Sequence, residues 1–122
     1  MISPRVHGIM DYLIGLVLLL APNLLGFAEV GGPAVGIPRV LGVIILLQAL
    51  ITDWPVAVAR ALPLRAHLML DYLLGAFLAA SPFLFGFNDE EPNAWVPHVL
   101  VGLLILGQAA LTRQRAERAL PR

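Results

Sequence analysis

The side chains with the clearest capacity for chemistry occur as two matching sets. The first set joins a histidine and an aspartate four residues apart to a glutamine and a threonine four residues apart: His7, Asp11, Gln48 and Thr52. The second set repeats these residue types later in the chain: His67, Asp71, Gln108 and Thr112. Residues four apart lie on one face of a helix. If the helices that carry a set run antiparallel, we expect its four side chains at one membrane depth.

Three interpretations of these sets remain open. The simplest is structural, since an aspartate near a helix N-terminus is stabilised by the helix dipole, and Gln and Thr hydrogen-bond across helix pairs. The second is a passage or binding site for protons, an ion or a small solute, because buried ionisable groups often mark such sites. The third is a metal or haem site, but no further ligand follows at a characteristic spacing. We therefore expect no metal and no cofactor.

The remaining chemistry-bearing residues indicate no enzyme. No serine, threonine or lysine stands in a recognisable nucleophile arrangement, and the chain has no cysteine. His98 is predicted at the outer end of its span, at the membrane interface, far from the other two histidines. The net charge is zero and no basic cluster interleaves with aromatics, so nucleic acid is not expected as a partner.

Membrane-spanning helices must position these residues. Of 122 residues, 59% are hydrophobic and 13% charged, a surface that a soluble domain of this size could not hide but that lipid solvates directly. The chain contains four apolar runs of about 16 to 22 residues. Runs of this length cross the membrane as helices, since a barrel would require alternating polarity. The fold class is therefore an all-α membrane protein with four transmembrane helices, at about 5–25, 38–53, 64–85 and 97–113.

The chain is internally duplicated. Of the 23 positions from Arg5 to Phe27, 11 are identical to their partners from Arg65 to Phe87. We predict two tandem helical hairpins, 1–60 and 61–122, related by a pseudo-twofold axis along the membrane normal. The second unit ends in a short basic tail.

Proline and glycine mark the predicted bends and ends of the helices. Pro22 and Pro82 lie inside the first span of each unit, where a missing N–H and a ring clash predict a kink. Gly26 and Gly86 then look like helix stops. Pro38 is predicted to open the second span, which makes that span short.

Small and aromatic residues complete the sequence pattern. Glycines and alanines on the helix faces favour close packing within the bundle, with a dimer seam, and thus a homo-oligomer, as the alternative. Trp54 and Trp95 are expected at opposite interfaces, as aromatic belts require.

Arginine placement predicts the orientation. Arg39 alone falls at one side of the spans. Seven arginines fall at the other side, in the N-terminus, the central loop and the tail: Arg5, Arg60, Arg65, Arg113, Arg115, Arg118 and Arg122. The positive-inside rule therefore puts both termini in the cytoplasm. We expect a multi-pass protein of the bacterial cytoplasmic (inner) membrane whose main partner is the lipid bilayer.

The tandem unit resembles a known family. His-x-x-x-Asp-Tyr, then glycine, a proline turn and Gly-Phe are similar to the SPW-repeat family of small bacterial membrane proteins, over nearly the whole chain. The signature tripeptide reads Ala21-Pro22-Asn23 and Ser81-Pro82-Phe83 here, so the proline is the shared element. The resemblance implies an integral membrane protein and carries over no activity, cofactor or substrate. We expect a non-enzymatic helix-packing or interaction module, with a small transporter or channel as the alternative.

Overall fold

Four long helices build the protein in a computed structural model that describes residues 1–112. They are α1 (Pro4–Leu24), α2 (Gly32–Ile51), α3 (Leu64–Leu84) and α4 (Pro92–Leu111), with a short 3-10 helix, η1 (Ala28–Val30), before α2. Each long helix has 20 or 21 residues, about 30 Å at 1.5 Å per residue, which matches the hydrocarbon core of a bilayer. All four are long and apolar enough to cross a membrane. The predicted all-α membrane fold is confirmed, while the basic tail lies outside the described residues.

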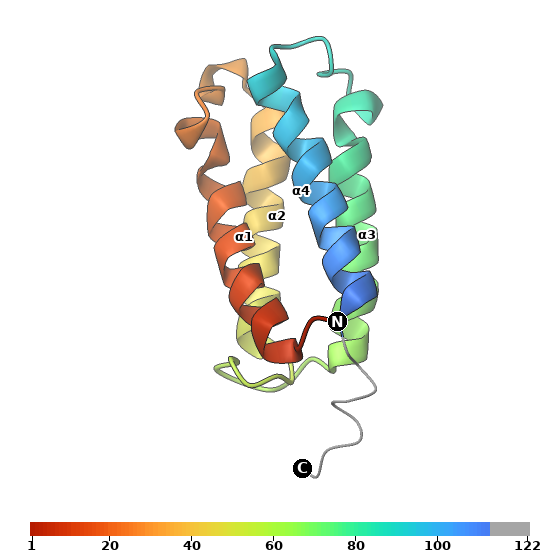
Figure 1. The fold of residues 1–122 in the computed structure, drawn as a ribbon. Coiled ribbons are helices and arrows are strands. Elements are labelled where there is room, and N and C mark those ends of the chain that lie inside the picture. The colour runs from red at the N-terminus through yellow and green to blue at the C-terminus, as the bar shows by residue number, and fades with distance from the viewer. Residues whose placement is uncertain (113–122) are drawn as a thin grey trace.

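The helices form two hairpins that pack side by side. Helix α1 lies against α2 and α3 against α4, and one end of the bundle holds the starts of α1 and α3 with the ends of α2 and α4 (Figure 1). Buried aliphatic residues from all four helices form the core at mid-height: Ile14, Leu18, Leu41, Ile45, Leu78 and Ile105. Large apolar side chains also cover the outside, among them Leu13, Leu16, Leu73 and Leu103. An outward apolar surface of this kind is suited to contact lipid tails.

Glycines let the two helices of each hairpin approach closely. A Cβ atom added to Gly42 would lie 2.7 Å from the Gly15 carbonyl oxygen, and one added to Gly102 would lie 2.7 Å from the Gly75 carbonyl oxygen. Only a residue without a side chain allows this spacing. These glycines are therefore used within the hairpins, as packing positions.

The predicted helix stops are confirmed. Gly26 and Gly86 follow the ends of α1 and α3 with φ angles of 76° and 73°, a conformation that glycine adopts without strain. The next residue donates its N–H back to the carbonyl of Pro22 or Pro82, at 2.9 Å in both copies. This is the bonding pattern of a Schellman cap.

Pro22 and Pro82, at equivalent positions of the repeat, lie inside their helices, as predicted. Pro82 has no N–H to donate to the Leu78 carbonyl, and the Ser81 hydroxyl donates to that oxygen instead, at 2.7 Å. A neighbouring side chain thus replaces the missing backbone donor in the second copy. A kink at Pro22 and Pro82 stays a prediction.

The prediction that Pro38 opens the second span is wrong. Helix α2 begins at Gly32, six residues earlier, after a turn in which Gly31 and Gly32 both have positive φ. Arg39 consequently lies within α2, in its second turn or beyond. Helix α4 likewise begins at Pro92 instead of residue 97. The second span of each hairpin, with 20 residues, is therefore nearly as long as the first, with 21.

Candidate functional site

The two predicted sets of polar residues meet in one buried cluster between the hairpins. The first two turns of α1 and α3 supply the histidines and aspartates, and the ends of α2 and α4 supply the glutamines and threonines. All eight side chains are buried: His7, Asp11, Gln48, Thr52, His67, Asp71, Gln108 and Thr112. Since the starts of α1 and α3 share one end of the bundle, the cluster lies toward that end (Figure 1).

Four atoms form the centre of the cluster, in an alternating ring. Nε2 of His7 lies 3.0 Å from Oδ2 of Asp71 and 3.3 Å from Oδ2 of Asp11. Nε2 of His67 lies 2.8 Å from Oδ2 of Asp11 and 3.1 Å from Oδ2 of Asp71. Each imidazole nitrogen therefore contacts both carboxylates, and each carboxylate oxygen contacts both imidazoles.

A threonine sets the tautomer of each histidine. The Thr112 hydroxyl donates its hydrogen to the Gln108 carbonyl at 2.6 Å. A hydroxyl has a single hydrogen, so Thr112 Oγ1 can only accept from His7 Nδ1, which lies 2.5 Å away. Nδ1 is therefore the protonated nitrogen, and Nε2 faces the carboxylates. The second copy repeats this chain of bonds at 2.7 and 2.5 Å, through His67, Thr52 and Gln48.

The side-chain hydrogen bonds of the cluster connect one hairpin to the other. His7 of the first hairpin bonds to Thr112 and Asp71 of the second, and His67 bonds to residues of the first. Gln108 Nε2 also donates to Asp11 Oδ1, at 3.0 Å. The two sets thus exchange partners across the hairpin interface. The exchange is reciprocal for the histidines and threonines, whereas the Gln108 bond to Asp11 has no matching bond from Gln48 to Asp71 among the described contacts. The predicted pseudo-twofold relation stays a prediction.

The backbone holds both threonines in place. The Ile2 N–H donates to the Leu111 carbonyl at 2.8 Å, next to Thr112. The equivalent pairing in the other half joins the Leu62 N–H to the Ile51 carbonyl at 2.7 Å, next to Thr52. The segment that leads into α1 is thereby tied to the end of α4, and the segment that leads into α3 to the end of α2.

Trp54 belongs to the site, and its prediction as an aromatic-belt residue facing the interface is wrong. Its side chain is 1% exposed. The ring packs on His67 and His7, with centroids 4.6 and 5.5 Å away, and its N–H donates to the Ala49 carbonyl at 2.9 Å. Trp54 covers the cluster because the connecting segment turns back under the bundle, which its position after a span could not reveal.

Tyr12 is a second residue that the sequence pattern left without a role. Its hydroxyl lies 2.9 Å from the Val56 carbonyl and 3.2 Å from the Ala49 carbonyl. One hydroxyl thus ties α1 to the end of α2 and to the segment that carries Trp54. The only available signal was the Asp-Tyr pair that the repeat retains.

His98 is buried between the helices, and its predicted depth at the membrane interface stays a prediction. Its Nε2–H donates to the Ala34 carbonyl at 3.1 Å. Ala34 is four residues before Pro38, which has no N–H with which to bond that carbonyl. His98 of the second hairpin therefore replaces a donor that the first hairpin lacks. Its ring packs against Phe27 and Phe87, and it takes no part in the polar cluster, as predicted.

The central ring requires positive charge between its atoms. Two nitrogen lone pairs and two carboxylate oxygens converge within 3.3 Å of their neighbours, and such acceptors repel unless a hydrogen or a cation lies between them. Two protons shared among the four groups make the ring neutral overall. A net charge in this apolar interior would be costly.

Comparison with known proteins identifies one match. The family model of the SPW repeat domain matches residues 5–112. No curated protein and no solved structure matches this chain. The match covers all four helices and every residue of the polar cluster.

Proposed function

This chain belongs to the SPW repeat domain family and is a small multi-pass integral membrane protein, and from its geometry we propose that it is a non-enzymatic helix-packing module. In this proposal the buried cluster joins the two hairpins into one four-helix unit. The protein resides in the bacterial cytoplasmic membrane with both termini on the cytoplasmic side.

The observation that carries the proposal is the cross-hairpin bonding of the cluster. Its contacts are internal to the protein, and they link α1 to α3 and both of these helices to the ends of α2 and α4. In lipid, apolar surfaces give little net attraction between helices, so hydrogen bonds and close packing must hold them together. A polar cluster that bonds the hairpins to each other meets this need.

One apolar cavity, away from the ionisable groups of the ring, favours packing over transport. A cavity of about 210 Å³ is lined by apolar side chains together with His98, toward the end opposite the cluster. None of the four ring residues lines it. A transporter would need a polar passage that reaches its ionisable groups, whereas here Trp54 and the connecting segment cover the cluster.

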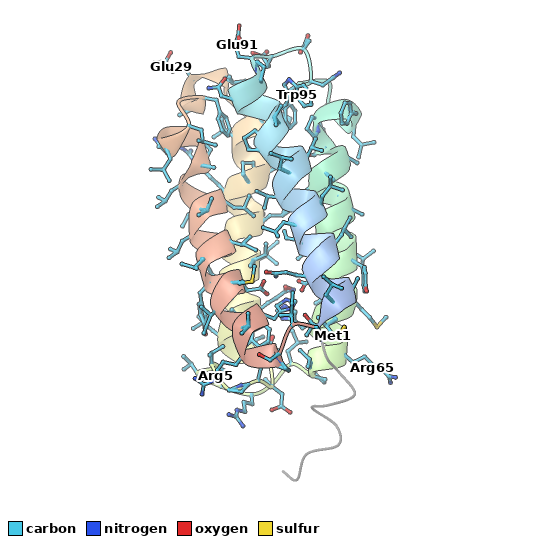
Figure 2. All side chains as sticks on the ribbon, in the orientation of Figure 1. Met1, Arg5, Glu29, Arg65, Glu91 and Trp95 are labelled. Carbon is cyan, nitrogen blue, oxygen red and sulfur yellow. The ribbon has the colours of Figure 1, made fainter. Side chains whose placement is uncertain are left out.

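The distribution of charge supports the proposed orientation. Figure 2 shows Arg5 and Arg65 at the cluster end of the bundle, with Glu29 and Glu91 at the opposite end. Arginines are retained on the cytoplasmic side of membrane proteins. The cluster end is therefore assigned to the cytoplasm.

Proton flux into liposomes tests the proposal. Purified protein is reconstituted into liposomes that hold a pH-sensitive dye. A pH gradient across the vesicle membrane is then imposed, together with a membrane potential generated by potassium diffusion. We expect wild-type protein and the Asp11→Asn/Asp71→Asn variant to give the same flux as protein-free vesicles. A wild-type flux several-fold higher, abolished by the double variant, would contradict the packing role and favour the transporter.

A further inference from the structure

We propose that His7, Asp11, His67 and Asp71 form a binding site for one divalent transition-metal cation of the zinc class. Each residue offers one ligand atom, and the four atoms lie within 4.8 Å of one another. All four residues are at most 2% exposed. Two imidazole nitrogens and two carboxylate oxygens are a donor set that zinc accepts.

The spacing of the four atoms fits a central cation. The N–O sides of the ring measure 2.8, 3.0, 3.1 and 3.3 Å. Ligands bound to zinc at about 2.0–2.2 Å are separated by about 2.8–3.1 Å in a square plane and about 3.3–3.6 Å in a tetrahedron. The four ring sides extend from the lower end of the square-planar range to the lower end of the tetrahedral range. A cation at the centre would reach all four atoms with shifts of a few tenths of an ångström.

The surroundings of the histidines orient them as metal ligands. A metal-binding histidine usually donates its other ring N–H to a nearby acceptor, which fixes the tautomer and the ring orientation. Thr112 and Thr52 accept in this way from Nδ1 of His7 and His67. Gln108 also donates to the second oxygen of Asp11. The support that a metal site needs around its ligands is already present.

Charge balance allows a divalent cation to replace two protons of the ring inside an apolar bundle. Without metal, two protons neutralise the two carboxylates. When a divalent cation binds through both carboxylates and both neutral imidazoles, the two protons leave and the net charge stays zero. No uncompensated charge is buried in either state. Mixed nitrogen and oxygen donors favour transition metals, since Ca²⁺ and Mg²⁺ prefer oxygen ligands alone.

This inference goes beyond the proposed packing role and does not depend on it. The cluster joins the hairpins whether protons or a cation occupy the ring. A wild-type chain that binds no zinc would overturn the metal site alone, whereas proton flux through the wild-type chain would overturn the packing role alone.

Zinc binding to the full chain in detergent tests the site. The protein is stripped with a chelator, titrated with Zn²⁺ in a calorimeter and analysed by mass spectrometry for bound metal. We expect one zinc per wild-type chain and at least about 100-fold weaker zinc binding for Asp11→Asn/Asp71→Asn. This loss of affinity exceeds the one usually caused by replacing a residue that only supports a metal ligand. His98→Gln removes a buried histidine outside the cluster and should bind as the wild type does.

The supporting threonines provide a second test. Thr52→Val/Thr112→Val keeps the side-chain shape but removes both acceptors of Nδ1, and we expect affinity to fall about 10–100-fold. Unchanged affinity in this variant would contradict the assigned orientation of the histidines. Equal zinc binding by the wild type and Asp11→Asn/Asp71→Asn would overturn the site.

X-ray absorption at the zinc edge of the wild-type protein covers the case in which the double aspartate variant fails to fold. We expect four nitrogen or oxygen ligands at about 2.0–2.1 Å with imidazole scattering. A six-oxygen shell without imidazole, or less than half an equivalent of zinc per chain, would overturn the proposal.

Discussion

Removal of the Asp11 carboxylate should remove two hydrogen-bonding contacts from the buried cluster. Oδ2 of Asp11 lies 2.8 Å from His67 Nε2, and Oδ1 accepts from Gln108 Nε2 at 3.0 Å. Alanine removes both contacts. Asparagine keeps an oxygen for Gln108, and its amide can donate to the unprotonated Nε2 of His67. The two substitutions therefore separate loss of hydrogen bonding from loss of charge.

The expected cost follows from these two bonds. An unsatisfied buried donor costs about 1–3 kcal/mol in soluble proteins, and measured side-chain hydrogen bonds in membrane proteins average about 0.6 kcal/mol with a maximum near 1.7. Taking about 1–2 kcal/mol for each of the two lost contacts, Asp11→Ala should lower the free energy of unfolding by about 2–4 kcal/mol. Asp11→Asn should lower it by less than about 1 kcal/mol.

Reversible unfolding in mixed detergent micelles, followed by circular dichroism, measures both values. Asp89→Ala is a suitable control because Asp89 is exposed in the loop between α3 and α4. We expect the control to stay within about 0.5 kcal/mol of the wild type. Equal losses for asparagine and alanine at position 11 would refute the hydrogen-bond reasoning, since the charge itself would then be required.

Three other pairs of substitutions test the topology, the packing and the cover of the cluster. Glu29→Cys should react with an impermeant thiol reagent from outside the cell and Ala59→Cys should not; reversed labelling would refute the assigned orientation. Gly42→Ala should destabilise the protein by about 1–3 kcal/mol, because its Cβ would meet the facing backbone. Gly36 has open space around it, so Gly36→Ala should be neutral or stabilising in the same unfolding assay. Trp54→Ala should cost about 3–5 kcal/mol, and Trp54→Phe clearly less because it keeps most of the ring packing; equal costs would show that the indole N–H dominates.

The sequence alone determined the fold class and the identity of the polar cluster. Four apolar runs of span length allow only helices in lipid, because every backbone group there must be satisfied within its own segment. The repeated spacing of His7 and Asp11 in the second copy placed these residues on one face of each first helix. Gly26 and its copy marked the helix ends, since the turn after each helix requires positive φ.

Partner choice was decided by the tertiary structure. Local spacing suggested that Thr52 belongs with His7 of its own hairpin, yet it bonds to His67 of the other. Spacing along a helix gives the face of a side chain but not the neighbour that the face meets. That choice depends on how the two hairpins dock.

The same reason explains the errors at Pro38 and Trp54. Pro38 lies within α2 because His98, distant in sequence, supplies the hydrogen bond that the proline lacks. Trp54 is buried because the connecting segment folds back over two histidines that the chain brings together from different hairpins. A residue's place in the sequence predicts its local conformation, but burial and long-range hydrogen bonds depend on surfaces that exist only after the helices have packed.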